Sequence, residues 1–450
     1  MNLMLEIVFR SWVRKGYLRI LDTKNEVSVF GSPAAWPKVT LRLHDSALPF
    51  QLMGDFVLAL GEAYMDGRFT IEQGTLYDLL DLLVMNYKDA PRTWFERVDQ
   101  FFAPMLRKLQ QYNPIPRARK NVAHHYDLSS KLYKLFLDKD MQYSCAYFRH
   151  PDDDLEEAQL EKKRHIAAKL LLRPGMRVLD IGCGWGGMGL YLAKNHGVEV
   201  VGLTLSEEQL KIATERAQQE GLAQKVKFYL RDYREEDGQY DRIVSVGMFE
   251  HVGVNHYPEF FAKVQGLLKH DGIMLLHSIG RMEEPGMTNR WMRKYIFPGA
   301  YAPALSEVFP AIEKKGLWAM DMEILRIHYA ETLRHWWMRF NENRGVISQI
   351  YDERFCRMWE FYLRGCEVHF RHMNLMVFQI QVAKHIDAVP IIRDYMLEGE
   401  REQRLDIHRI YPTPANQVIE PVVGLSSRFP GVFYQTTAHR FNGTHYATRR

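Results

Sequence analysis

The chain has 450 residues, of which 46% are hydrophobic and 25% charged, and its formal net charge is +4 at pH 7. This composition is typical of a globular protein with more than one domain, and so small a charge does not by itself indicate a nucleic-acid-binding protein. The four cysteines are widely spaced and form no CxxC pair, which argues against a zinc site or a disulfide scaffold and favours a reducing cytoplasm. No apolar run reaches the roughly 18 residues that span a bilayer.

Residues 1–103 are expected to form a small α+β domain. The segment 1–16 is apolar but contains Glu6 and Arg10 and lacks a small-residue cleavage site, which favours an amphipathic helix over a signal peptide. The alternating segment Lys38–Leu43 predicts a strand, and Leu52–Met65 and Leu76–Tyr87 predict helices. After this domain we expect a basic linker at residues 104–123, whose charge suits lipid phosphates or, equally, plain exposure to solvent.

The main domain is expected at residues 124–397, followed by an extension at 398–450. An amphipathic helix is predicted at Leu155–Leu172, opened by the acidic cluster Asp152–Asp154, which suits a helix start. Strands and helices then alternate, with strands at Arg177–Ile181, Val198–Leu203, Val226–Leu230, Asp241–Val246 and Gly272–Ser278 and helices at Gly187–Asn195, Ser206–Glu220 and Tyr257–Leu268. This order predicts an α/β fold with a parallel, doubly wound sheet. Beyond Arg281 we expect mainly helices, with their aromatic residues in the core.

The segment Val178–Gly187 (VLDIGCGWGG) joins the first of these strands to a helix. Its glycines satisfy G-x-G-x-x-G, a pattern that lets the backbone approach a nucleotide-like cofactor at the start of a helix. Asp180 stands two residues before Gly182 and, with Gly184 and Gly186, completes D-x-G-x-G-x-G. A carboxylate at that position can receive the ammonium group of a methionine moiety, whereas it would repel a pyrophosphate.

The second strand gives a further argument against NAD, because it ends in Thr204-Leu205 and not in the acid that binds ribose hydroxyls. Thr204 and Gln209 are the candidates for that hydrogen bonding. Asp232, which closes the third strand, is the candidate for the adenine amino group, and Tyr233 is the candidate for packing on the ring. Together these residues predict a class I, Rossmann-like methyltransferase that uses S-adenosylmethionine and no metal.

Seven blocks in order resemble the family of cyclopropane-fatty-acyl-phospholipid synthases and the related mycolic-acid methyltransferases. The blocks are His125–Asp127, Met141–Phe148 (MQYSCAYF), Val178–Gly187, Val200–Ser206, Asp241–Gly253 (DRIVSVGMFEHVG), Leu275–Gly280 and Lys294–Gly299. Gly61–Gly67 (GEAYMDG) is similar to the accessory N-terminal domain of the bacterial lipid enzymes. The resemblance runs from roughly residue 40 to 395 and is specific as a set.

The resemblance implies methylene transfer from S-adenosylmethionine to a cis double bond in an acyl chain of a membrane phospholipid. It also implies a bound bicarbonate ion as the base, with ligands at Cys145, Glu250, His277, Ile279 (through its backbone) and Tyr329. Tyr143 and Ser144 match positions that contact the cofactor's carboxylate end. Family analogy further implies a cytoplasmic homodimer, peripherally associated with the inner face of the cell membrane through its N-terminal domain, which would serve in lipid binding and dimerisation.

The chemistry of the residues is consistent with these implications but leaves alternatives open. Methyl transfer to an alkene produces a carbocation, which aromatic faces stabilise, and a base must then remove a proton to close the ring. Glu250 suits an anion site only if it is protonated or accepts the hydrogen of bicarbonate. Taken singly, Cys145 is more often a buried small apolar residue than a functional one, and His277 is equally explained as a core histidine. The alternatives are a methyltransferase that makes methyl- or methylene-branched lipids or methylates a small amine, and a catalytically silent lipid-binding protein.

Overall fold

A computed structural model describes residues 3–87 and 130–410. The chain divides into two compact units, Met1–Gln403 and Arg404–Arg450, and the elements that form the site lie in the first. The expected linker at 104–123 and the block His125–Asp127 lie outside the described residues. Within the described ranges, no helix is both long and apolar enough to cross a membrane.

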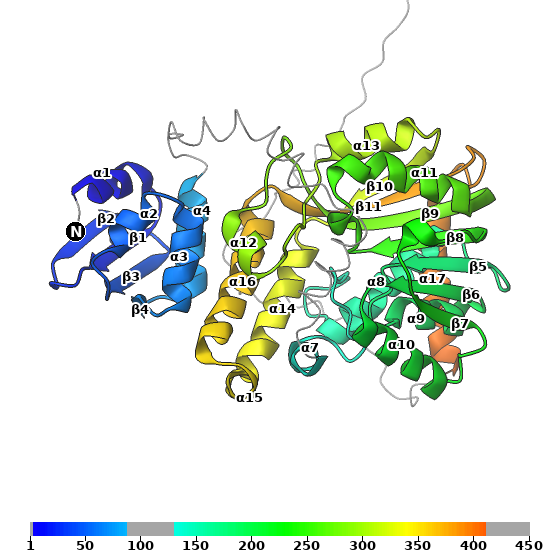
Figure 1. Cartoon of the computed structure of the whole chain (residues 1–450), viewed down its shortest axis with the longest axis horizontal. Coiled ribbons are helices and arrows are strands. Elements are labelled where there is room, and N and C mark those ends of the chain that lie inside the picture. The colour runs from blue at the N-terminus through cyan, green and yellow to red at the C-terminus, as the bar shows by residue number, and fades with distance from the viewer. Residues whose placement is uncertain (1–2, 88–129, 411–450) are drawn as a thin grey trace, which may run out of the picture. The chain divides into compact units, whose positions relative to one another are not determined.

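The N-terminal part of the chain, drawn in blue in Figure 1, is a four-stranded sheet with helices. Its elements are α1 (Leu3–Trp12), β1 (Tyr17–Leu21), β2 (Val27–Gly31), β3 (Lys38–Leu43), α2 (Leu48–Leu52), α3 (Phe56–Met65), β4 (Phe69–Gln73) and α4 (Leu76–Tyr87). The expected strand at Lys38–Leu43 and helix at Leu76–Tyr87 are confirmed. The single helix expected at Leu52–Met65 is wrong, because Asp55 caps a new helix there and accepts a hydrogen bond from the Leu58 backbone N–H at 3.1 Å.

The main sheet has seven strands in the order β10-β11-β9-β8-β5-β6-β7. The strands are β5 (Arg177–Ile181), β6 (Glu199–Thr204), β7 (Val226–Leu230), β8 (Tyr240–Val246), β9 (Leu268–Arg281), β10 (Trp318–Ile324) and β11 (Leu375–Ala383). The five strands predicted from the sequence are parallel to one another. The expectation of a wholly parallel sheet is wrong, however, because β11 runs antiparallel to β9 and β10 runs antiparallel to β11.

Helices cover both faces of this sheet, as a doubly wound α/β fold requires (Figure 1). The described helices that follow the N-terminal part, only some of which contact the sheet, are α7 (Ser130–Phe136), α8 (Leu155–Leu170), α9 (Gly187–His196), α10 (Glu207–Gln219), α11 (Tyr257–Leu267), α12 (Arg290–Tyr295), α13 (Leu305–Glu313), α14 (His328–Glu342), α15 (Arg344–Ile350), α16 (Glu353–His372) and α17 (Asp394–Ile410). Successive strand residues face opposite sides: Ile243 packs with α11 and α13, and Val244 packs with α8 and α9. The extension expected from residue 398 begins inside α17.

The helix expected at Leu155–Leu172 is confirmed as α8, but its expected amphipathic character is wrong, because most of its polar residues are buried too. Asp154 caps the helix as predicted, accepting a hydrogen bond from the Glu157 N–H at 2.9 Å. Its basic residues are buried along with its apolar ones, and they are Lys162, Lys163, Arg164, His165 and Lys169. Buried charges persist only when they are paired, and partners come from distant segments, such as Glu323 on β10 for Lys169. The helix therefore carries a polar layer into the interior, beside the carboxyl ends of the strands.

Candidate active site

A pocket opens at the carboxyl ends of β5, β6 and β8, where the strand order of the sheet reverses. Ligands of open α/β sheets bind at such a switch point. Of the residues expected to bind the cofactor, all but Gly186 line this pocket, namely Tyr143, Ser144, Asp180, Gly182, Gly184, Thr204, Leu205, Gln209, Asp232 and Tyr233. The glycine loop, two strand ends and the Met141–Ser144 segment thus converge on one cavity.

Asp180, at the end of β5, is the most unusual group in the pocket. Its side chain is buried, and its Oδ2 atom has no hydrogen-bond partner among the described residues. Burial raises the pKa of Asp180 to about 7, against the opposing charge of Lys162. An unpaired buried carboxylate is costly to maintain, so this group is suited to a cationic ligand that pairs with it on binding.

The other polar residues of the pocket are held by their neighbours. Thr204 Oγ1 lies 2.8 Å from Gln209 Oε1. Two oxygens can share a hydrogen bond only if the hydroxyl donates, so Gln209 keeps its amide N–H groups for a ligand. The Asp232 carboxylate accepts from the Arg234 guanidinium at 2.7 and 2.8 Å. A carboxylate has further lone pairs, so Asp232 can still accept from an adenine amino group.

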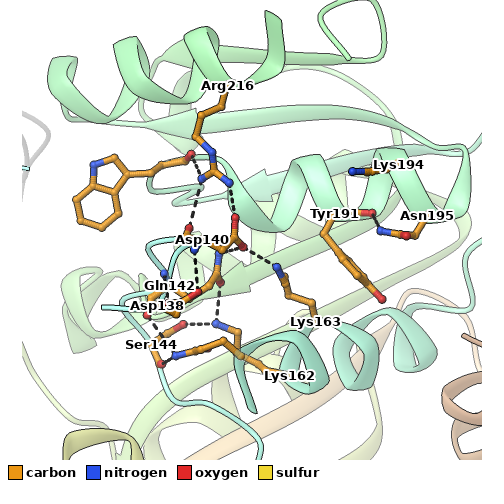
Figure 2. A network of polar contacts seen from close by, with 12 residues as sticks. Asp138, Asp140, Gln142, Ser144, Lys162, Lys163, Tyr191, Lys194, Asn195 and Arg216 are labelled. Atoms are coloured by element: carbon orange, nitrogen blue, oxygen red, sulfur yellow. Dashed lines mark hydrogen bonds and ion pairs between the residues drawn. The ribbon is translucent and has the colours of Figure 1, made fainter. Parts of the chain in front are cut away.

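A buried lysine holds the segment that forms one wall of the pocket (Figure 2). Lys162 Nζ donates to Gln142 Oε1 at 2.7 Å and to Ser144 Oγ at 2.8 Å. Because an ammonium can only donate, the Ser144 oxygen accepts from it and the Ser144 proton remains available to a ligand carboxylate. Asp140 anchors the same segment through ion pairs with Lys163 and Arg216. This role for Lys162 was not predicted, because the sequence pattern indicated only an amphipathic helix.

The residues expected to bind an anion are next to the pocket but are not among the described residues that line it. Glu250 lies in the 3₁₀ turn Phe249–His251 and accepts a hydrogen bond from the Ile279 N–H at 2.6 Å. Its second oxygen, Oε2, is buried and has no partner among the described residues. Burial raises the pKa of Glu250 to about 7. His277 lies two residues before Ile279 on β9 and is buried, which holds the pKa of its imidazole well below the usual range.

Cys145 and Tyr329 are joined to this region through α14. The residue after Cys145, Ala146, donates its N–H to Thr332 Oγ1 at 3.0 Å, and Thr332 lies one turn after Tyr329 on α14. Burial raises the pKa of the Cys145 thiol, while the charge of Lys162 opposes the shift. The Tyr329 ring meets Trp336 edge-on at 5.8 Å, and Trp336 stacks on Tyr143 at 5.0 Å. Aromatic rings therefore extend from the cofactor pocket to Tyr329.

The comparisons with known proteins agree with this geometry. The family model described as mycolic acid cyclopropane synthetase matches residues 115–380. The chain belongs to this family. It is 40% identical over 335 residues to the cyclopropane-fatty-acyl-phospholipid synthase of Escherichia coli K12, covering 73% of this chain and 84% of that protein. It is 34% identical over 355 residues to a probable fatty acid methyltransferase of Pseudomonas putida, covering 77% and 88%.

Solved structures of the family show the same fold. The mycolic acid cyclopropane synthase CmaA1, crystallised with SAH and CTAB, is 34% identical to this chain, with a TM-score of 0.57 over 61% of this chain and 99% of that one. The protein is therefore an S-adenosylmethionine-dependent methyltransferase with the predicted α/β fold. The unpaired carboxylate of Asp180 fits the cofactor's ammonium group, and the Ser144 hydroxyl fits its carboxylate.

Cofactor affinity should depend on pH through Asp180. We expect the cofactor's ammonium group to bind the ionised carboxylate, and burial raises the pKa of Asp180 to about 7. As pH falls below about 7, Asp180 must lose a proton before it pairs, so affinity should fall by up to about tenfold per pH unit. Calorimetric titration with S-adenosylmethionine at pH values between about 5 and 7 measures this slope, since an α-amino group stays protonated in that range. A flat profile would show that Asp180 does not pair with the ammonium.

Gly186 stands apart from the other glycines of the loop because it packs against protein instead of the pocket. It precedes α9 with φ of 84°, and a Cβ atom there would lie 2.6 Å from the Phe228 ring. We expect Gly186→Ala to lower the free energy of unfolding by about 2–5 kcal/mol, through the left-handed backbone and the overpacked contact together. Gly175, with φ of 82° and nothing within 4 Å of its Cβ position, is the matched control.

Gly175→Ala should cost only the backbone part, about 1–2 kcal/mol. Urea denaturation of both variants measures the difference. Equal losses would mean that Phe228 moves aside freely and that Gly186 is not required for packing.

Proposed function

We propose that the protein transfers a methylene group from S-adenosylmethionine to a cis double bond in an unsaturated phospholipid acyl chain, forming a cyclopropane ring. The observation that carries this proposal is the Glu250 carboxyl beside the cofactor pocket, with one oxygen on the Ile279 N–H and the other without a partner among the described residues. Ring closure needs a base that accepts a proton, and this second oxygen can orient a small anion that would serve as the base. The 40% identity to the Escherichia coli synthase supports the same substrate class.

The residues around the pocket suit each part of this chemistry. When bound, S-adenosylmethionine supplies an electrophilic methyl group on a sulfonium. The alkene's π electrons form the new C–C bond while the C–S bond breaks onto sulfur, which leaves a carbocation on the acyl chain. The rings of Tyr143, Tyr329 and Trp336 offer π faces and edges in a buried region, and π faces attract a cation. Loss of a proton from the added methyl group then lets its C–H electrons close the ring.

The residues also fit a small anion as the source of the base. Bicarbonate would be held by the Cys145 thiol, the His277 ring, the Ile279 backbone and the Tyr329 hydroxyl, and would supply an acceptor for that proton. Glu250 can lie beside a bicarbonate anion because burial raises the pKa of its carboxyl to about 7, so that a substantial fraction is protonated near neutral pH. Its protonated form donates to the anion, and its ionised form accepts the hydrogen of bicarbonate, whereas an amide NH₂ can only donate.

We propose, in addition, that the protein binds the inner face of the cell membrane peripherally and acts as a homodimer. Membrane binding is supported by the substrate class and by two large apolar side chains on the N-terminal part, Trp36 and Phe50, which are 68% and 64% exposed. Sedimentation with phospholipid vesicles tests the first idea. Analytical ultracentrifugation tests the second, for which the family resemblance is the only support.

Lipid analysis after expression in a host that lacks the activity tests the main proposal. We expect cyclopropane fatty acids in place of part of the cis-unsaturated chains. Methyl- or methylene-branched chains without rings would contradict ring closure and favour the alternative of a branching methyltransferase.

A further inference from the structure

The partner of His277 within the sheet is a buried glutamine. Strand β11 pairs with β9 so that Gln379 lies directly across from His277. Gln379 Nε2 and His277 Nδ1 are 3.2 Å apart, and both side chains are buried. The pair alone does not show which residue donates the hydrogen bond, because a glutamine amide can present either its oxygen or its nitrogen to an imidazole.

A lysine on α8 decides which way the amide faces. Lys169 Nζ lies 2.7 Å from the Gln379 oxygen, Oε1. The Lys169 ammonium also forms an ion pair with Glu323 on β10, which favours its charged form. An ammonium has donors and no acceptor, so the amide oxygen must face Lys169 and the amide NH₂ must face His277.

The orientation of Gln379 then fixes where His277 carries its proton. The Gln379 N–H donates, so His277 Nδ1 must accept and cannot hold a proton. Burial keeps the imidazole neutral, since it lowers the pKa of His277 well below the usual range. The one proton of the neutral ring is therefore on Nε2, on the side of the ring away from Gln379.

We propose that Lys169 and Gln379 are positioning residues that hold His277 as the Nε2–H tautomer, so that the ring donates to the anion beside Glu250. This inference rests on the proposed function for the identity of the anion, but not for the tautomer itself. In the opposite tautomer Nε2 would present a lone pair to an anion and repel it. The partners that orient a functional histidine are, as a rule, as important as the residue itself.

The same strand offers a matched control, Gln381. This residue is as buried as Gln379, and its amide donates to the Lys169 backbone oxygen at 2.6 Å while accepting from the Tyr395 hydroxyl at 2.9 Å. Its cross-strand partner is Leu275 and not His277. A substitution at Gln381 thus disturbs the same strand, and the same neighbouring lysine, without touching the imidazole.

The experiment is ¹⁵N NMR of the full-length protein labelled with ¹⁵N-histidine, with the His277 signals assigned by their loss in His277→Asn. In the wild type we expect a protonated Nε2 and an unprotonated Nδ1. In Gln379→Glu the carboxylate accepts at Nδ1, so a proton should appear there, and turnover should fall by at least about 100-fold. The dissociation constant of S-adenosylmethionine should stay within about threefold. Gln381→Glu should leave the His277 pattern unchanged.

Lys169→Met gives a second route, because without the ammonium Gln379 can present either end and the His277 signals should show a mixture of tautomers. A wild-type His277 protonated at Nδ1 would overturn the proposal, and so would full turnover in a Gln379→Glu protein whose Nδ1 is protonated. The NMR result needs neither turnover nor bicarbonate. If wild-type turnover proved independent of added bicarbonate, the proposed base would fail while the tautomer assignment stood.

Discussion

Glu250→Gln should reduce turnover by about 100- to 1000-fold while changing cofactor affinity by no more than a few-fold. The glutamine oxygen can still accept from the Ile279 N–H, so the local backbone should be kept. The amide NH₂ that replaces Oε2 can neither accept a hydrogen nor change its charge, which removes one group that orients the anion. Loss of a single preorganised polar group at a reacting centre typically costs this much. Steady-state kinetics and calorimetric binding of S-adenosylmethionine measure the two quantities.

Two further variants make this result specific. Tyr329→Phe keeps the buried ring but removes its hydroxyl, and it should show the same separation of turnover from binding. Glu367, on α16, is an equally buried carboxylate that pairs with Arg364 and Arg371 instead of facing the pocket. Glu367→Gln should lower stability with turnover within a few-fold of wild type. Equal loss of turnover and cofactor binding in Glu250→Gln would show that its assignment to the anion site is mistaken.

Asp180→Asn should weaken S-adenosylmethionine binding by about 30- to 1000-fold, because truncating one partner of a buried charge pair costs about 2–4 kcal/mol. The same variant should make the ligand-free protein more resistant to heat at pH 8. The pKa of Asp180 is about 7 in the folded chain, against about 3.9 for an unperturbed Asp. Folding therefore disfavours the ionised form of Asp180. The resulting destabilisation of the folded protein is fully present above pH 7 and is lost as pH falls toward 4. Asparagine carries no such penalty.

Asp241 at the start of β8 is the control for this prediction. Its carboxylate pairs with Lys269 at 2.8 Å and accepts from the Arg177 N–H at 2.8 Å, and both contacts lower its pKa. Asp241→Asn should lower the melting temperature at pH 8 and leave cofactor affinity unchanged, the opposite of Asp180→Asn in both respects. Melting curves at pH 5 and pH 8 measure these effects. A melting temperature of Asp180→Asn below that of the wild type at pH 8 would mean that the Asp180 carboxylate already has stabilising partners in the ligand-free protein.

Most of the residues expected to bind the cofactor line one pocket because their determinants are local. The glycine loop, Asp180 and the end of β6 each follow a strand, and parallel strands bring their carboxyl ends to one edge. The exception is Gly186, which serves packing against Phe228, a contact that spacing cannot reveal. The proposed anion site rests on family resemblance, because its residues come from separate segments and most of them, taken singly, are equally explained as core residues.

The features that the sequence missed are tertiary. Strand β11 is a nearly continuous apolar run in a region of aromatic helices, and its place beside β9 depends on pairing across the fold. The amphipathic pattern of α8 does not show which of its lysines are buried, and Lys169 is buried where it pairs with Glu323 and Gln379. Partners from distant segments decide which charged side chains are buried. The helical periodicity of the sequence therefore could not identify Lys162 or Lys169 as part of the site.

The central claim is ring formation on a lipid, and product analysis with purified protein tests it most directly. The protein is incubated with S-adenosylmethionine, bicarbonate and vesicles of a phospholipid with one cis-unsaturated chain, and the released fatty acids are examined by mass spectrometry and proton NMR. We predict chains heavier by one CH₂ group that resist mild hydrogenation and show the upfield methylene protons of a cyclopropane. Chains of the same mass that take up hydrogen and show a methylene branch would contradict the proposal.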